Sequence, residues 1–347
     1  MQISHYFQEA IQRQASDLHL VSGSIPAIRV DGDLAKLSDE ILNDQELREE
    51  LKLIIKPKIL TKFESDLVVD FSQEIYGGRF RINLHYQEGK IGLTARLIPE
   101  TIPGPSELRF NEDIYRLTHF RDGLILVTGT SGSGKSTTLA AMIDIINQER
   151  RSHIITIEDP IEYIFKEKQS IIEQREIGRD TKSFSSALKY ALRQDPNIIM
   201  VGEMRDLETI SLALTAAETG HLVLSTLHTA TAPETITRIV DTFPAHQQQQ
   251  ILNQLSSSLR AVITQQLLPK FDSGRVAARE IMVSNNAIAS LIRSNKINQI
   301  LTAIQTGQNH GMITMNKSIN QLLDEGMITS KTAQNRKRRF DTKVSYY

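Results

Sequence analysis

The chain has 347 residues, of which 40% are hydrophobic and 23% charged, enough for two domains of ordinary size. Its formal net charge of −1 excludes an overall basic field, so we expect no nucleic-acid partner. The absence of cysteine excludes disulfides and thiolate metal sites and is typical of a reducing compartment. No signal-peptide pattern and no 18-residue apolar run occurs, so we expect a cytoplasmic protein that reaches a membrane only through a partner.

The first hundred residues mix short helical and strand patterns. We expect a first helix capped by Ser4 and a second over residues 44–55 that Pro57 ends. Apolar alternation predicts strands, with a turn at Asp31-Gly32-Asp33 after the second of them. These strands cover residues 18–21, 27–30, 67–71, 78–85 and 91–98. The order predicts a small sheet with helices on one side, in a domain over residues 1–98.

A stretch rich in proline separates this pattern from a different one, and we place a linker at residues 99–110. In the second domain, residues 111–347, nearly continuous apolar runs alternate with helix-like segments. Such runs predict a parallel sheet covered on both faces, and they lie at residues 124–127, 153–157, 198–201 and 222–224. From about residue 245 onward we expect a wholly helical region, so the overall fold class is α/β.

A complete phosphate-binding loop follows the first of these runs. Residues 129–136 read Gly-Thr-Ser-Gly-Ser-Gly-Lys-Ser, which matches the pattern G-x-x-x-x-G-K-[ST]. The glycines let successive N–H groups surround a phosphate, and the following helix adds its positive N-terminal dipole. Lys135 can reach the outer phosphates, and the Ser136 hydroxyl can ligate magnesium. We predict ATP and Mg²⁺ as cofactors, held by Thr130, Ser131, Gly132, Ser133, Gly134, Lys135, Ser136 and Thr137.

ATP is preferred to GTP because guanine specificity usually requires an N-K-x-D string. The nearest approach, Asn295-Lys296-Ile297-Asn298, lacks the aspartate.

Two carboxylates follow predicted central strands, where ligands of open parallel sheets bind. Glu158 ends the run at residues 153–157, and Glu203 follows the run at residues 198–201. We predict that both are catalytic and that both contribute to the magnesium site, although such residues are most often helix caps or solvated loop acids. His228 could sense the terminal phosphate, but a lone histidine at a strand end is more often structural. The sequence pattern by itself therefore does not decide whether His228 is functional or structural.

A basic run, Arg336-Lys337-Arg338-Arg339, stands near the end of the chain. Such a run is most often a solvated helix end, and we expect that here rather than a binding site.

Several further strings occur in a fixed order between residues 16 and about 230. They are Ser16-Asp17-Leu18-His19-Leu20, Arg29-Val30-Asp31-Gly32-Asp33, Gly78-Arg79-Phe80-Arg81-Ile82-Asn83, Ala95-Arg96-Leu97-Ile98-Pro99, Thr156-Ile157-Glu158-Asp159-Pro160-Ile161-Glu162-Tyr163, Gly202-Glu203-Met204-Arg205-Asp206-Leu207-Glu208-Thr209-Ile210 and Thr226-Leu227-His228-Thr229. Together with the phosphate loop they strongly resemble the secretion ATPase superfamily, and within it the type IV pilus retraction ATPase family (PilT).

The resemblance implies a PAS-like N-terminal domain, a RecA-like motor domain and a homohexamer with ATP at its subunit interfaces. It implies an acidic box with Glu158 and Glu162, a Walker B Glu203, and a histidine box with His221 and His228. It also implies that Arg81 and Arg96 reach the phosphates of an adjacent site, where they would neutralise charge on the transferred phosphoryl group. The implied function is ATP-driven pilus retraction and twitching motility at the cytoplasmic face of the inner membrane, acting on a pilus platform protein.

Two departures from the family pattern bear on this assignment. Thr130-Ser131 replace the usual Pro-Thr pair of the loop, at positions that contribute mostly backbone. The family's A-I-R-N-L-I-R string reads Ala-Ile-Ala-Ser-Leu-Ile-Arg at residues 287–293, keeping the last arginine, Arg293, and losing the first. Arg293 and the helices around it are our candidates for contact with the membrane partner.

Three other functions are weighed against retraction. A pilus extension or type II secretion ATPase usually has a four-cysteine zinc site, which this cysteine-free chain cannot form. A DNA translocase is disfavoured by the near-neutral charge and by 5% aromatic residues. A non-hydrolysing scaffold would not need Glu158, Glu203 and candidate arginine fingers.

Overall fold

The computed structural model describes residues 3–30, 33–98 and 101–337, which form two compact units. The N-terminal unit contains the described residues up to Thr101 together with residues 160–164. The motor unit contains residues 102–159 and the described residues from Phe165 onward.

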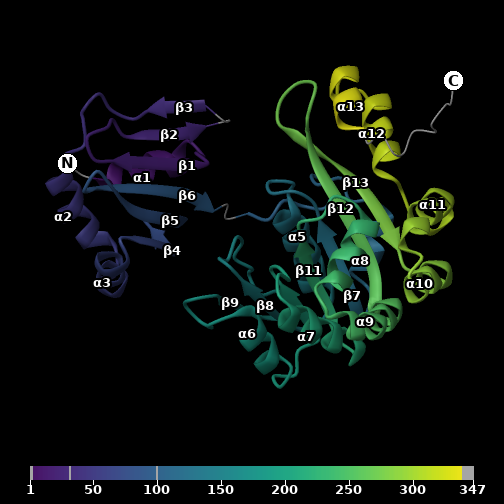
Figure 1. Ribbon diagram of the computed structural model, residues 1–347. Coiled ribbons are helices and arrows are strands. Elements are labelled where there is room, and N and C mark those ends of the chain that lie inside the picture. Colours follow the sequence, from purple (N-terminus) through teal and green to yellow (C-terminus); the bar gives the residue numbers. More distant parts are fainter. Residues whose placement is uncertain (1–2, 31–32, 99–100, 338–347) are drawn as a thin grey trace. The chain divides into compact units, whose positions relative to one another are not determined.

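The N-terminal unit is a six-stranded antiparallel sheet with three helices (Figure 1). Its strand order is β3-β2-β1-β6-β5-β4. The strands are β1 (Asp17–Val21), β2 (Ala27–Val30), β3 (Asp33–Lys36), β4 (Val68–Ile75), β5 (Gly78–Gln87) and β6 (Lys90–Ile98). The helices are α1 (Ile3–Gln12), α2 (Asp44–Ile54) and α3 (Pro57–Asp66).

One face of this sheet carries the core. Along β5 the side chains alternate, with Phe80 and Ile82 fully buried and Arg81 exposed between them. The ring of Phe7 on α1 meets that of Phe80 edge-on, with 5.0 Å between centroids. Apolar residues of all three helices join the same cluster, which confirms the expected arrangement of helices on one side.

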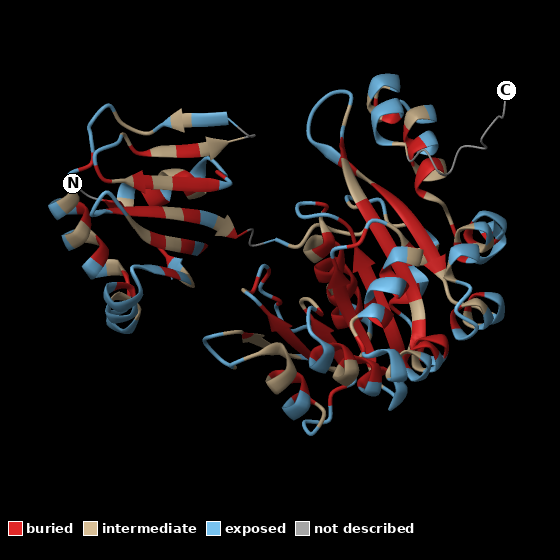
Figure 2. Ribbon diagram, viewed as in Figure 1, coloured by how far each residue is buried: buried red, intermediate tan, exposed pale blue. Residues whose placement is uncertain are grey.

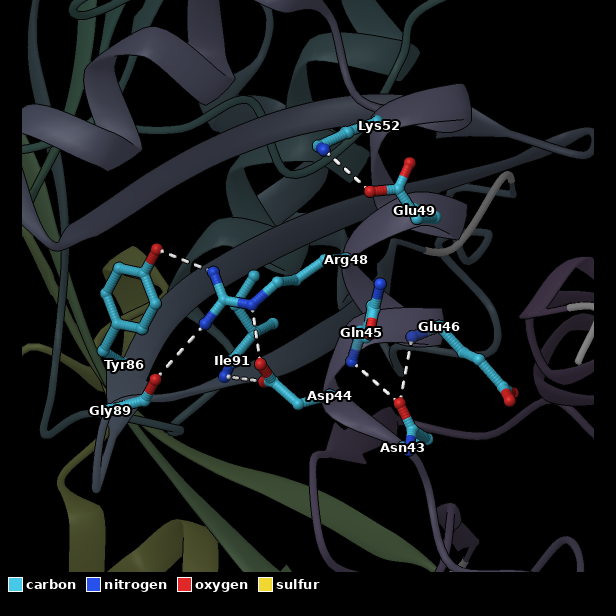
Figure 3. Close-up of polar contacts among 10 residues, drawn as sticks. All are labelled: Asn43, Asp44, Gln45, Glu46, Arg48, Glu49, Lys52, Tyr86, Gly89 and Ile91. Atoms are coloured by element: carbon cyan, nitrogen blue, oxygen red, sulfur yellow. Dashed lines mark hydrogen bonds and ion pairs between the residues drawn. The ribbon is translucent and has the colours of Figure 1, made fainter.

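The start of α2 is fixed by a polar network (Figure 3). Asn43 caps the helix, since its side-chain oxygen accepts from the backbone N–H groups of residues 45 and 46. Asp44 accepts from the Ile91 N–H at 2.8 Å and pairs with Arg48. Arg48 also donates to the Tyr86 hydroxyl and to the Gly89 carbonyl. These bonds join α2 to the β5–β6 hairpin.

Three local expectations for this unit were wrong or incomplete. Ser4 is the second residue of α1 and so is not its cap. Pro57 follows the end of α2 but also begins α3, because proline suits the first position of a helix. β3 was not predicted, and Asp31 and Gly32 of the expected turn lie outside the described residues. The other five strands are confirmed, with ends shifted by up to four residues.

The motor unit is built on a seven-stranded sheet of order β13-β12-β7-β11-β10-β8-β9. All neighbouring pairs are parallel except β12 with β13. Figure 2 shows the central strands buried along their length, as expected of a sheet covered on both faces. The strands are β7 (Gly123–Thr128), β8 (His153–Glu158), β9 (Ile171–Glu176), β10 (Ile198–Val201), β11 (Leu222–Leu227), β12 (Leu259–Pro269) and β13 (Arg275–Val283).

Helices cover both faces of the motor sheet. On one face, residues from helices α6 to α11 share a core with Leu124, Leu126 and Ile155. The alternate side chains of β7 point to the other face, and α5 packs against β7 and β11. The helices are α4 (Glu112–Leu117), α5 (Lys135–Glu149), α6 (Phe184–Ala191), α7 (Leu207–Glu218), α8 (Ala232–Asp241), α9 (Ala245–Ser258), α10 (Asn286–Arg293), α11 (Ile300–Thr306), α12 (Met315–Asp324) and α13 (Ser330–Arg336), with short 3-10 turns at Ile297–Gln299 and Gln308–His310.

The expectation of a wholly helical region from residue 245 onward was wrong. β12 and β13 form an antiparallel hairpin there, and β12 extends the parallel sheet beside β7. The run Val262, Ile263 and Thr264 is β-branched and fully buried between its neighbours, which favours a strand. Gly274 belongs to the hairpin turn, with a φ of +76°. After β13 the described chain is helical, as predicted.

Among the described residues, no helix combines the length and apolar character needed to span a membrane.

Candidate active site

The phosphate loop joins the end of β7 to the start of α5. Gly134 is the residue before α5 and adopts a left-handed conformation, with a φ of +85°. Gly129 has a φ of +143°, and a Cβ there would lie 2.4 Å from the Gln265 carbonyl oxygen and 2.6 Å from Ser133 Oγ. Both positions therefore require glycine, and the backbone curls as a phosphate cradle needs. Ser136 and Thr137 lie in the first turn of α5 and are half-buried.

Lys135 is held against the loop that it follows. Its Nζ donates to the carbonyls of Gly129 and Thr130, each at 3.0 Å, and the side chain is buried. Ser133 Oγ is buried without a hydrogen-bond partner among the described residues. A buried hydroxyl without a partner beside a lysine and a curled backbone fits a phosphate, whose oxygen would accept its hydrogen bond.

A residue of β12 that the sequence analysis missed supports this loop. The Gln265 amide donates to the Ser133 carbonyl and accepts from Thr138 Oγ1 at 2.8 Å. It also accepts from Arg279 Nε at 3.1 Å, and burial, with the charge of Arg109 as a second cause, lowers the pKa of Arg279 to about 10. A second contact, between the hydroxyls of Thr128 and Thr264, joins the end of β7 to β12 at 2.9 Å.

A cavity of about 370 Å³ opens beside the loop. Besides the loop residues 129–133 it is lined by Ala230, Thr264, Gln265, Gln266, Leu267, Arg275 and Arg336. Arg336 is the exposed last residue of α13, so it is a helix end as expected, and it also lines the phosphate cavity. Arg338 and Arg339 of the same basic run lie outside the described residues. Two arginines at the mouth of the cavity suit a ligand as anionic as a nucleotide.

Glu158 and Glu203 lie at the carboxyl ends of neighbouring strands, as predicted: Glu158 is the last residue of β8, and Glu203 stands two residues after β10. A Cβ on Gly202 would lie 3.2 Å from the Ile157 carbonyl and 3.5 Å from the Glu158 Cα, so this glycine allows the ends of β10 and β8 to approach closely. Glu158 is buried, and its Oε1 accepts from the Thr156 hydroxyl at 2.7 Å and from the Gln174 amide at 3.3 Å.

Glu203 and His228 lie together at the ends of β10 and β11. Glu203 Oε2 is 3.8 Å from His228 Nε2 and 2.7 Å from Arg205 Nε. Burial and the positive charges of Lys135 and Arg205 lower the pKa of His228 below its ordinary value, while Glu203 opposes the shift. The imidazole is therefore uncharged at neutral pH, and Lys135 is close enough to influence it. The motor unit thus brings the loop lysine, one acidic residue and the histidine to one edge of the sheet.

Comparisons with known proteins identify the family of the chain. A profile for the family described as "Type II/IV secretion system protein" matches residues 106–274. The type IV pilus retraction ATPase PilT of Pseudomonas aeruginosa is 47% identical over 96% of this chain and 97% of that protein. A "Twitching motility protein" of Neisseria gonorrhoeae is 46% identical over 90% of this chain and 84% of that protein.

A solved structure matches the whole chain as well. The crystal structure of the pilus retraction motor PilT with bound ADP superposes with a TM-score of 0.91 at 48% identity, covering 96% of each chain. The chain belongs to the PilT family of retraction ATPases. It is therefore a nucleotide-binding P-loop ATPase, and its fold class, an N-terminal domain followed by a RecA-like motor domain, is confirmed.

The altered PilT-family string at residues 287–293 lies in α10, which Asn285 caps. Ile288 and Ile292 are buried, whereas Arg293 is exposed and its Nε donates to Ser256 Oγ on α9 at 3.3 Å. The apolar spacing of the family string is kept because it packs α10 on the core.

The predicted arginine fingers of the PilT family lie on the N-terminal unit. Arg81 on β5 stands directly opposite Arg96 on β6, and Arg96 stands opposite Asp17 on β1. Arg96 Nε donates to Asp17 Oδ1 at 2.9 Å, while the exposed Arg81 has no partner among the described residues. The two positively charged side chains are thus neighbours on the polar face of the sheet, opposite the core.

Proposed function

We propose that this protein is a homohexameric motor that hydrolyses ATP to drive type IV pilus retraction and twitching motility. One observation carries the proposal: a complete phosphate loop with its acidic and histidine partners, in a chain 47% identical to a retraction ATPase along nearly its full length. We also propose the division into residues 1–98, a linker at 99–110 and a motor domain at 111–347.

Hydrolysis is assigned to the edge of the motor sheet. Thr130 to Thr137 hold the phosphates of ATP, and Glu203 orients and deprotonates the attacking water. Mg²⁺ would be held by Ser136, Glu158 and Glu203, and it would neutralise charge on the phosphates. His228, uncharged and beside Glu203, relays the state of the terminal phosphate.

Arg81 and Arg96 act on a site in an adjacent subunit of the ring. Two guanidinium groups side by side on a polar sheet face can neutralise the charge that grows on the transferred phosphoryl group. Because Arg96 is tethered by Asp17 and Arg81 is not, we assign positioning to the first and direct phosphate contact to the second.

The motor works at the cytoplasmic face of the inner membrane and grips a pilus platform protein there. The exposed Arg293 at the end of α10 is the candidate contact.

The test is deletion of the gene in its host, with surface pili counted by electron microscopy and twitching measured on agar. Retraction predicts more pili and lost movement. Complementation with the intact gene should restore both phenotypes, and complementation with Glu203→Gln should restore neither.

Loss of surface pili would instead favour pilus extension and would overturn the retraction proposal. Unchanged pili and movement would exclude both functions. The homohexamer is tested separately by light scattering of purified protein, where a mass other than about six chains in the presence of ATP would contradict it.

A further inference from the structure

A second cavity lies at the opposite edge of the motor sheet from the phosphate loop. It has a volume of about 450 Å³ and is lined by residues just before four central strands. We call it the amino-end pocket, and its lining residues are Arg121, Arg150, Arg151, Ser152, Asn197 and Gly220. Because β7, β8, β10 and β11 are parallel, their amino ends gather here while their carboxyl ends carry the catalytic residues.

The side chains of this pocket are rich in hydrogen-bond donors and include no carboxylate. The guanidinium groups of Arg121 and Arg151 have no partner among the described residues. Asn197 uses its side-chain oxygen to accept from the His153 N–H, which leaves its amide N–H₂ group for a ligand. The neighbouring Asp122 pairs with Arg260, so it does not neutralise the pocket.

The side chain of Arg150 is held in place by two backbone carbonyls. Its Nη1 donates to the carbonyls of Thr118 and Phe120, at 3.2 and 2.9 Å, so the side chain is fixed while most of its N–H groups remain available. Burial, and after it the charge of Arg121, lower the pKa of Arg150. Three like charges around one cavity repel one another, and an anion between them would relieve that repulsion.

We propose that the amino-end pocket binds a phosphate-bearing anion with more than one negative charge. Guanidinium groups match the oxygens of phosphate in pairs, and three of them suit at least two phosphate charges. The volume lies in the range of small-molecule sites. The same chemistry occurs in a soluble phosphate ester and in the headgroup of an acidic phospholipid. This site is independent of the proposed retraction function.

Pyrophosphate is the probe for the soluble source. Full-length protein is first saturated with ADP, so that the phosphate loop is occupied, and is then titrated with pyrophosphate by calorimetry. We compare the natural chain with Arg121→Gln/Arg151→Gln, in which both changed residues are exposed and the fold is retained. The matched control is Arg238→Gln, an exposed arginine of α8 without a partner among the described residues.

We expect one pyrophosphate per chain, with affinity about tenfold or more lower in the double variant and unchanged in the control. ADP affinity should be equal in all three proteins, which shows that the phosphate loop is intact. Equal pyrophosphate affinity in the natural chain and the double variant would overturn the proposal that the pocket binds a soluble phosphate ester.

Flotation with vesicles tests the lipid source. Binding to cardiolipin vesicles, whose headgroup carries two phosphates, but not to phosphatidylcholine vesicles, lost in the double variant and kept in Arg238→Gln, would identify a headgroup. If the double variant matches the natural chain in both titration and flotation, the pocket is not an anion site.

Discussion

The two sheets of this protein differ in how many of their faces are covered by helices, and this difference determines where each sheet can carry charged residues. The N-terminal sheet is antiparallel and has its helices on one face, so the other face is free to carry polar side chains. Arg81, Arg96 and Asp17 form a row across that face. The motor sheet is covered on both faces, so its strands can offer functional groups only at their ends.

This difference separates the effect of a substitution on function from its effect on folding. On the N-terminal sheet, changing a polar-face residue leaves the core face untouched. At the ends of the motor strands, the proposed catalytic residues stand one or two positions from fully buried ones, such as Ile157 beside Glu158. The predictions below test this contrast, from the largest expected effect to the smallest.

Glu203→Gln at the end of β10 should lower kcat for ATP by about 10³-fold, because the amide cannot accept a proton from water. Nucleotide affinity should change little, since the phosphate loop is unaltered. Steady-state ATPase assays and ADP titrations measure the two quantities. Near-normal turnover would remove Glu203 from the catalytic role.

Arg81→Ala on the polar face should lower kcat by about 10²-fold while the thermal midpoint stays within measurement error. Arg13→Ala, an exposed arginine on the turn after α1, is the matched control and should leave both unchanged. Mixing Arg81→Ala with Lys135→Ala subunits should restore part of the activity, because some interfaces then combine an intact arginine with an intact loop. No recovery in mixed rings would argue against a site shared between subunits.

Gln265→Leu tests the strand that the sequence analysis missed. The substitution removes a donor to the Ser133 carbonyl and an acceptor for Thr138 and Arg279, so it should destabilise the protein by about 1–3 kcal/mol and weaken ADP binding. The side-chain amide of Gln266 has no partner among the described residues, so Gln266→Leu should lower the free energy of unfolding by less. Denaturant unfolding and calorimetry measure these effects, and equal costs would show that the Gln265 bonds are unimportant.

His228→Gln should alter the pH dependence of stability slightly. Because the pKa of His228 is lowered on folding, the unfolded chain binds a proton first as pH falls through the ordinary histidine range, and stability is lost there. Replacing the histidine removes that loss. The side chain is about half exposed, so the effect should be small. The difference in thermal midpoint between the two proteins should change by only about 1 °C in favour of the variant as pH falls from 7.5 to 5.5. A constant difference would mean that the pKa is not lowered.

The phosphate loop and the positions of Glu158 and Glu203 at the ends of central strands could be predicted because their signals are local. Gly129 to Ser136 form a contiguous pattern, Glu158 directly follows an apolar run, and Glu203 is separated from its run by Gly202 alone. Gln265 could not be found in this way, because its role depends on β12 pairing with β7, about 130 residues earlier in the chain. Nothing in its neighbourhood marks a glutamine as a partner of the loop.

Arg336 and the amino-end pocket illustrate the same limit. A basic residue at a helix end is usually solvated, and only the fold places Arg336 at the phosphate cavity. Arg121 and Arg150 are 29 positions apart, and they come together because parallel strands begin at one edge. A site built from several loops that are far apart in the sequence is not marked by any contiguous sequence motif.

β12 contacts parts of the motor unit that are far apart along the chain. This single strand of 11 residues, roughly 36 Å long, pairs with β7 at its start and reaches Leu268 near its end. Leu268 is packed in one cluster with residues of α12 and α13. Between these points lies Gln265, in contact with the phosphate loop. The strand is therefore one continuous element that contacts both the phosphate loop and the last helices of the described chain.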